Sequence, residues 1–177
     1  MGAPTDPLLD LLRPILDRLH ALAPETRTSP ASHAELLATL NRELPVDGPQ
    51  VAAIGAELER GVREGWLCDR GEPDARFSRV ARPSPQTRDL SIDVVSLQGA
   101  ALRHTHPRGE ITLGFAAPGS DPSAVRFDGH GPGWVFCAPG STHTPTTTGG
   151  RMHLLYFLPK GAVTWHSSQA PAPPQLP

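Results

Sequence analysis

The spacing of apolar residues changes near residue 77, and this change restricts the chain to a fold with a helical part and a β part. Before residue 77, apolar residues recur at helical spacing in three stretches. After it, short segments rich in β-branched and aromatic residues alternate with turns rich in Gly, Pro, Asp and Ser. We therefore expect an α+β fold, a helical segment followed by a sandwich or barrel. The expected strands span 77–82, 90–97, 110–116, 124–127, 133–137 and 151–158.

Local signals predict where the three helices begin and end. The first helix starts at Asp6, and Pro14 should kink it or divide it. The second starts at Ser32, which forms a capping box with Glu35 three residues later. The third runs over 49–66. These helices belong to a segment expected to span residues 1–76.

The apolar residues of the first helix cover more than one narrow stripe, which is more than a lone helix needs to bury internally. We expect part of this face to meet the barrel or a second subunit, and predict a homodimer that also covers the barrel's strand edges. The alternative is packing on the other two helices of the same chain. The residues concerned are Leu8, Leu11, Leu12, Ile15, Leu16 and Leu19.

Charge gives no reason to expect nucleic acid or an anionic membrane as a partner. The chain has 16 basic and 18 acidic residues, and its first 80 residues carry 9 Arg against 13 Asp and Glu. A winged helix with residues 66–80 as its wing is the alternative, but a DNA reader needs basic residues to replace phosphate counterions. We therefore expect no binding of nucleic acid.

Cysteine use and hydropathy predict a reduced, cytoplasmic protein. Cys68 and Cys137 lack the CxxC spacing of a zinc or redox site. The first apolar run is interrupted by charge, unlike a signal peptide, and no apolar stretch approaches the ~20 residues that cross a bilayer. The last residues, 167–177, form a proline-rich tail that we expect to be disordered.

The stretch GAALRHTHPRGEITLG (99–114) has the residue types of a metal site. His104 and His106 are two residues apart on an expected strand, so both imidazoles point to one face. Glu110 follows a Pro/Gly turn that can bring its carboxylate beside them. Imidazole and carboxylate together suit Fe, Mn, Ni or Zn as divalent ions. The alternative is a pair of surface histidines and a solvated glutamate.

The stretch GWVFCAPGSTHTP (133–145) ends a strand in the turn Pro139–Gly140, with His143 three residues beyond. Together the two stretches resemble the cupin superfamily, whose motifs are G-x5-HxH-x3,4-E-x6-G and G-x5-PxG-x2-H. Here glycine directly follows the proline, and the glycines of the first motif stand closer than in the pattern. The resemblance implies a cupin jelly-roll barrel over 77–166. It also implies a divalent metal ion held by His104, His106, Glu110 and His143.

Further stretches of the chain carry a narrower resemblance. They are SIDVV (91–95), HTHPRGE (104–110), GWVFCAPGSTHTPTTTGGRM (133–152) and LYFLPKGAV (155–163), with EGWLCDR (64–70) and FSRV (77–80) in support. In these stretches the C-terminal half resembles the 4-hydroxylaminobenzoate lyase family of nitroaromatic degradation. This resemblance implies that 4-hydroxylaminobenzoate, a small aromatic carboxylate, is converted with water to 3,4-dihydroxybenzoate and ammonia. That reaction needs no nicotinamide or flavin, and the chain has no GxGxxG after a strand and no P-loop.

The substrate carboxylate favours an arginine as its partner, because a guanidinium donates two parallel hydrogen bonds. Arg103 and Arg151 are the nearest candidates in sequence, and strand alternation turns Arg103 away from His104, which favours Arg151. Tyr156, the only tyrosine, is a candidate to orient substrate or donate a proton. A surface position for Arg151 and core packing for Tyr156 are the other interpretations.

Two other functions fit the same ligands. One is a metal-dependent cupin dioxygenase or isomerase acting on a small aromatic or keto acid, which would be told apart by its oxygen requirement. The other is a non-enzymatic sensor, with the barrel binding a small molecule and the helical segment binding DNA.

Overall fold

Three helices precede the strands, as the sequence predicts. The structure, a computed structural model, describes residues 5–166; the predicted tail, 167–177, lies outside the described residues. The helices are α1 (Asp6–Leu22), α2 (Pro30–Glu43) and α3 (Pro49–Glu64). One-turn 3₁₀ helices, η1 (Pro24–Thr26) and η2 (Pro85–Thr87), lie in the connections. None of the described helices is long and apolar enough to cross a membrane.

The helical prediction differs from the structure in two details. Pro14 does not divide α1, which is one continuous helix because buried leucines on both sides of the proline hold it to the sheet. The other expectation for Pro14, a kink, stays a prediction. The capping box of α2 is formed by Ser29 and Ser32, not by Ser32 and Glu35: each serine hydroxyl accepts from the other's backbone N–H, at 3.1 and 3.2 Å. Pro30 fixes this earlier start, because proline suits the first helical position.

The described strands form three antiparallel sheets, which confirms the α+β prediction. The large sheet has the order β1-β2-β3-β10-β5-β7, the small sheet β11-β4-β8, and a two-stranded ribbon pairs β6 with β9. All six predicted strands are present: those over 90–97, 110–116 and 133–137 have the predicted bounds, and the other three have shifted ends. The strands are β1 (Arg70–Glu72), β2 (Ala75–Ala81), β3 (Leu90–Leu97), β4 (His104–His106), β5 (Glu110–Ala116), β6 (Arg126–Phe127), β7 (Gly133–Cys137), β8 (Ser141–His143), β9 (Thr147–Thr148), β10 (Met152–Pro159) and β11 (Thr164–Trp165).

The chain passes directly between the large and small sheets four times, as in a jelly roll, because β3 leads to β4, β4 to β5, β7 to β8 and β10 to β11. The last three connections link β10, β5 and β7 of the large sheet to β11, β4 and β8, which follow the same order in the small sheet. β2 pairs with β3 along the large sheet, so it belongs to the barrel and is not a free wing of the helical segment.

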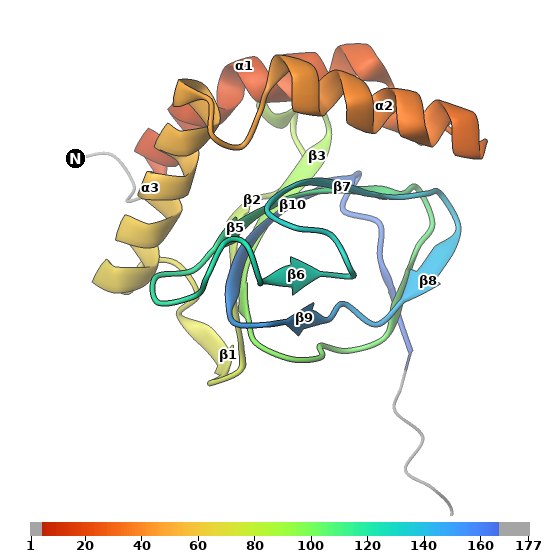
Figure 1. Ribbon diagram of the computed structural model, residues 1–177. Helices are drawn as coiled ribbons and strands as arrows, with labels where there is room; N and C mark the ends of the chain where they lie inside the picture. Colours follow the sequence, from red (N-terminus) through yellow and green to blue (C-terminus); the bar gives the residue numbers. More distant parts are fainter. Residues whose placement is uncertain (1–4, 167–177) are drawn as a thin grey trace, which may run out of the picture.

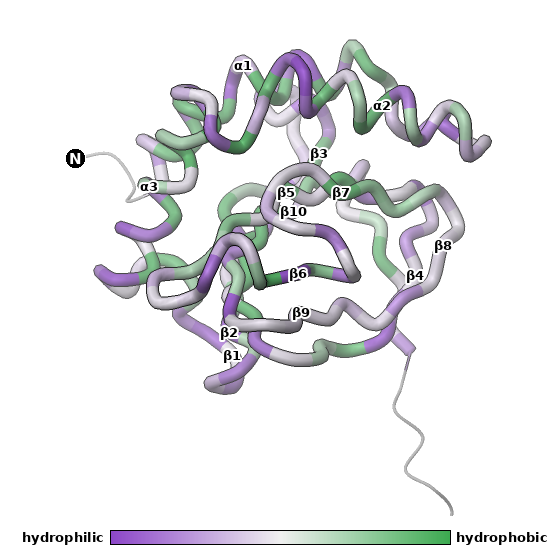
Figure 2. The backbone as a smooth tube through the Cα atoms, viewed as in Figure 1, coloured by the Kyte–Doolittle hydropathy of each residue, from purple (hydrophilic) through white to green (hydrophobic). Residues whose placement is uncertain are grey.

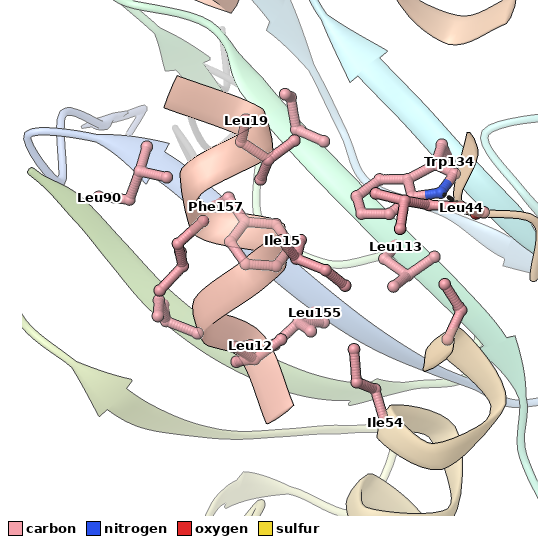
Figure 3. Packing of buried hydrophobic residues seen from close by; sticks show 14 of the residues in the cluster. Leu12, Ile15, Leu19, Leu44, Ile54, Leu90, Leu113, Trp134, Leu155 and Phe157 are labelled. Carbon is pink, nitrogen blue, oxygen red and sulfur yellow. Dashed lines mark hydrogen bonds between the residues drawn. The ribbon is translucent and has the colours of Figure 1, made fainter. Parts of the chain in front are cut away.

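The helices cover the outer face of the large sheet (Figure 1). Leu12, Ile15 and Leu19 of α1 pack with Leu155 and Phe157 of β10, as Figure 3 shows. The apolar residues of α1 alternate with polar ones along the chain (Figure 2). The apolar face of α1 is thus buried within its own chain, against both the barrel and α3, so the expected barrel contact and the alternative contact with another helix both occur.

A hydrogen bond anchors the end of α2 to the sheet. The indole Nε1 of Trp134, on β7, donates to the backbone oxygen of Leu44 at 2.7 Å. Leu44 caps the C-terminus of α2, where backbone oxygens have no partner within the helix. The helical residues and the outer face of the sheet therefore share one hydrophobic core.

The inner face of the large sheet forms a second, smaller cluster. Strand alternation sends Leu154 and Tyr156 of β10 to this face, while Leu155 and Phe157 point to the helices. Ribbon residue Phe127 packs in the same inner cluster, with its ring centroid 6.3 Å from that of Tyr156. The inner face is where the two sheets face each other, and it holds the polar residues described next.

Candidate metal centre and active site

Three histidines from the small sheet meet at a single point. His104 and His106 lie on β4, and His143 lies directly opposite His104 on β8. The three Nε2 atoms are 3.0 Å (His104–His106), 2.9 Å (His106–His143) and 3.3 Å (His104–His143) apart. His106 is completely buried, and His104 nearly so. Residues 37 or more positions apart in the sequence are thus brought together by the pairing of two short strands.

The outer nitrogens of two of these rings define their tautomers. Nδ1 of His104 lies 2.8 Å from the backbone oxygen of Leu102, and Nδ1 of His143 lies 2.7 Å from Oδ2 of Asp128. A carbonyl and an ionised carboxylate only accept hydrogen bonds, so each Nδ1 carries the proton. The Nε2 atoms of His104 and His143 therefore present lone pairs to each other at 3.3 Å.

This arrangement fits a bound cation. A proton on Nε2 of His106 can be shared with its two neighbours, but it leaves the lone pairs of His104 and His143 facing each other. A cation between the three nitrogens satisfies all of them. Nitrogens bound 2.1 Å from one ion lie about 3.0 Å apart at octahedral angles and about 3.4 Å apart at tetrahedral ones. The observed separations of 2.9–3.3 Å span this range.

Glu110 adds a buried carboxyl group to the centre. Its Oε2 lies 3.6 Å from Nδ1 of His106, which has no hydrogen-bond partner among residues 5–166. The hydroxyl of Thr112 donates to Oε1 of Glu110 at 2.9 Å. Burial raises the pKa of Glu110 to about 8, and burial together with the other two histidines lowers the pKa of His106 to about 3. A nearby cation would favour the ionised carboxylate and the neutral imidazole that metal ligation needs.

Cys137 is a further sulfur donor at the same place. It stands opposite Glu110 in the pairing of β5 with β7, and its Sγ lies 3.9 Å from Nδ1 of His143. The donor atoms of His106, Glu110, Cys137 and His143 all lie within 4.8 Å of one another, so the structure holds a possible metal site. Burial raises the pKa of the Cys137 thiol, which favours its neutral form.

Most of the chain matches the model of an enzyme family. Residues 18–165 match the family described as PnbB: 4-hydroxylaminobenzoate lyase. The chain belongs to this family. It is 28% identical over 148 residues to the 4-hydroxylaminobenzoate lyase of Pseudomonas putida, covering 76% of this chain and 84% of that protein. It is 30% identical over 118 residues to the 4-hydroxylaminobenzoate lyase of Nocardioides sp. (strain LMS-CY), covering 63% and 70%.

Similar solved structures include a cupin and another lyase. An RmlC-like cupin protein from Ralstonia eutropha is 17% identical with a TM-score of 0.40, over 55% of this chain and 62% of that chain. The DMSP lyase DddQ from Ruegeria pomeroyi is 20% identical with a TM-score of 0.39, over 94% and 95%.

Tyr156 and Arg151 are the other two predicted site residues of this lyase-family protein. Only Tyr156 lies on the inner face. Burial raises the pKa of its phenol well above the ordinary value, with added effects of Glu110 and Asp128, so the hydroxyl stays protonated. Arg151 is not brought to the histidines. Its guanidinium donates to the backbone oxygens of Pro73 and Ser96 at 3.0 and 3.3 Å, fixing the β1–β2 turn.

Asp128 is the contact that sequence reasoning missed. Besides holding His143, its Oδ1 accepts from the backbone N–H of Thr146 at 2.8 Å. It lies in the turn FDGHGPG with a φ of 47°, a left-handed conformation that Asp and Asn tolerate better than most residues. The turn glycines were the only sign of this loop, and nothing in its composition linked it to a histidine 15 residues away.

Proposed function

We propose that this protein is a 4-hydroxylaminobenzoate lyase, which converts its substrate and water to 3,4-dihydroxybenzoate and ammonia. The match of residues 18–165 to that family carries the proposal. The convergence of three histidines beside a buried carboxyl group supports it, because such a centre suits hydrolytic and elimination chemistry.

The reaction balances without an external oxidant or reductant. Breaking the N–O bond reduces the nitrogen, and adding oxygen to the neighbouring ring carbon oxidises the ring by the same two electrons. When the hydroxylamine oxygen leaves as water, one water adds to the ring carbon and a second replaces nitrogen as ammonia. The net consumption is one water, and loss of a ring proton restores aromaticity.

We assign His104, His106, His143 and Glu110 as the residues that hold a divalent metal ion, which is Fe, Mn, Ni or Zn. When bound, the ion supplies Lewis acidity that polarises oxygen and acidifies water. The chain's own residues prepare that site. Leu102 and Asp128 fix two imidazoles with their lone pairs inward, and Thr112 orients the carboxyl group of Glu110.

Tyr156 is assigned as the proton donor to the departing hydroxylamine oxygen. It lies beside Thr112 on the inner face, and its phenol is protonated at neutral pH because burial raises its pKa. A neutral phenol can donate a proton where a carboxylate cannot. Tyr156→Phe should therefore lower kcat while leaving metal content unchanged.

An anaerobic assay tests the function. Freshly purified protein is analysed for metals, then mixed with 4-hydroxylaminobenzoate without oxygen, and ammonia and 3,4-dihydroxybenzoate are measured. The lyase should form both products in equal amounts, and chelation should stop turnover. A requirement for oxygen would favour the dioxygenase alternative, and full turnover at sub-stoichiometric metal would refute the metal's role.

We also propose that the protein is a homodimer. Among the described strands, the outer edge of β1 has no partner, and a second copy related by a two-fold axis can pair with it. Sedimentation at micromolar concentration tests this, and a monomer would refute it.

A further inference from the structure

We propose that Arg79 binds the carboxylate of the substrate at the open edge of the barrel. This inference rests on the proposed function, since it concerns the group that distinguishes 4-hydroxylaminobenzoate from an uncharged aryl hydroxylamine. The substrate would lie along the inner face, with its carboxylate at β2 and its hydroxylamine at the histidines.

Arg79 lies in the same row of the large sheet as the proposed catalytic residue. Arg79 on β2 pairs with Asp93, Asp93 with Tyr156, Tyr156 with Thr112, and Thr112 with Val135. Directly opposed residues in an antiparallel sheet point to the same face. Because strands are ~4.8 Å apart, the backbone of Arg79 lies about 10 Å from that of Tyr156, within reach of a long side chain and a small substrate.

Along this row of the inner face, solvent exposure rises toward β2. In this row Thr112 and Tyr156 are buried, Asp93 is partly buried, and the Arg79 side chain is 41% exposed. The small sheet opens in the same direction. Trp165 on β11 pairs with His104 and is 61% exposed. β11 is the edge strand of the small sheet and is joined to β10 of the large sheet. We therefore infer that β3 and β2, which lie beyond β10, extend past the edge of the small sheet, and that Arg79 lies at this uncovered edge.

Asp93 holds the guanidinium but occupies only one side of it. Nε of Arg79 donates to Oδ1 of Asp93 at 2.8 Å, and Nη2 lies 3.4 Å from Oδ2. The other edge of the fork, Nη1 with the second N–H of Nη2, has no partner among the residues that the structure describes. That edge matches a carboxylate, which accepts two parallel hydrogen bonds. Because Asp93 already orders the side chain, binding costs less conformational entropy.

The location distinguishes Arg79 from the other arginine considered. Arg151 uses its N–H groups on the backbone at Pro73 and Ser96. The inner-face residues of the large sheet's described strands include two arginines, Arg79 on β2 and Arg70 on β1. Arg70 lies one strand further from Tyr156, and its guanidinium lies 5.1 Å from the ring centroid of Phe77. Arg79 is therefore the nearer of the two to the proposed catalytic residue. A β-bulge follows Arg79, so that both Val80 and Ala81 pack toward the helices while Arg79 faces inward.

The test compares substrates with and without the carboxylate. Arg79→Gln should lower kcat/KM for 4-hydroxylaminobenzoate about 10- to 100-fold, the loss expected for a charge-assisted hydrogen bond. The value for phenylhydroxylamine should stay unchanged. Arg63→Gln, which removes a charge from exposed α3, is the matched control. Asp93→Asn breaks the ion pair yet keeps the arginine, and should retain the preference for the carboxylated substrate.

A binding measurement makes the result independent of turnover. Calorimetry compares 3,4-dihydroxybenzoate with catechol, and Arg79→Gln should abolish the wild type's preference for the former. The inference would be overturned if Arg79→Gln lowered kcat/KM equally for both substrates, or left kcat/KM for 4-hydroxylaminobenzoate unchanged. It would also be overturned if the wild type bound 3,4-dihydroxybenzoate and catechol with equal affinity. A wild type that prefers 3,4-dihydroxybenzoate but turns over no aryl hydroxylamine would refute the proposed function and leave the carboxylate site standing.

Discussion

Replacing Asp128 with Asn should weaken metal binding without unfolding the protein. Asn tolerates the left-handed backbone of this position, and its side-chain oxygen can still accept from Thr146. The side-chain nitrogen of the asparagine then takes the place of Oδ2 beside His143. An amide NH₂ group donates hydrogen bonds and cannot accept one from Nδ1–H of His143. The imidazole then favours the tautomer with its proton on Nε2, where the lone pair is needed for a metal ion.

The size of the effect follows from the contact that is lost. The bond from His143 to Asp128 is 2.7 Å long, and a hydrogen bond to a charged group contributes about 1.5–3 kcal/mol. Outer partners of this kind change metal affinity about 10- to 100-fold, or about 1.4–2.8 kcal/mol. The side chain of Asp128 is 22% exposed, so solvent weakens the interaction and the lower half of that range is expected.

The assay titrates metal-free protein with Zn²⁺ in competition with a chromophoric chelator, and records melting temperatures with and without metal. Asp121→Asn is the matched control, because Asp121 is an exposed turn residue whose carboxylate, among the described residues, accepts hydrogen bonds only from Ser123. If Asp128→Asn binds Zn²⁺ within about twofold of the wild type, against the 10-fold minimum expected for such a partner, Asp128 does not set the tautomer of His143.

Three further outcomes are expected. His106→Ala should lose most of its metal, measured by elemental analysis, yet keep its circular dichroism spectrum, because apolar packing holds the barrel. Chelation should lower the melting temperature, since metal at 100 times its Kd stabilises by about 2.7 kcal/mol; an unchanged value would argue against a metal site. Trp134→Phe should lower the free energy of unfolding by about 1–3 kcal/mol in urea titrations, because Leu44 loses the donor to its buried oxygen.

The sequence predicted the strands well because their signals are local. Each predicted strand is bounded by Gly, Pro or Asp, and turn residues act within two or three positions. The prediction missed β1, β8, β9 and β11, which have only two or three residues and no period to detect. It also placed the second cap at Ser32, since a Ser followed three residues later by Glu carries the same signal as the true Ser29–Ser32 pair.

Some residues of the candidate site were indicated by their neighbours in the sequence, whereas others are brought to it only by the fold. His104, His106 and Glu110 follow one another within seven positions, so their spacing indicated them, and the resemblance of the second motif to cupins added His143. The contact of Asp128 with His143 and the proposed role of Arg79 both depend on the register of strands and loops that meet in three dimensions.

The outer face of the large sheet packs against the helices, whereas its inner face carries the candidate site, so stability and metal binding can be tested separately. Leu155 and Phe157 of β10 pack against the helices, while Tyr156 between them faces the inside. Burying Glu110 and His106 without a bound cation costs folding free energy, which the apolar outer face offsets. Substitutions on the outer face should therefore change stability at constant metal affinity. Conservative substitutions on the inner face should change metal binding or substrate preference at nearly constant stability.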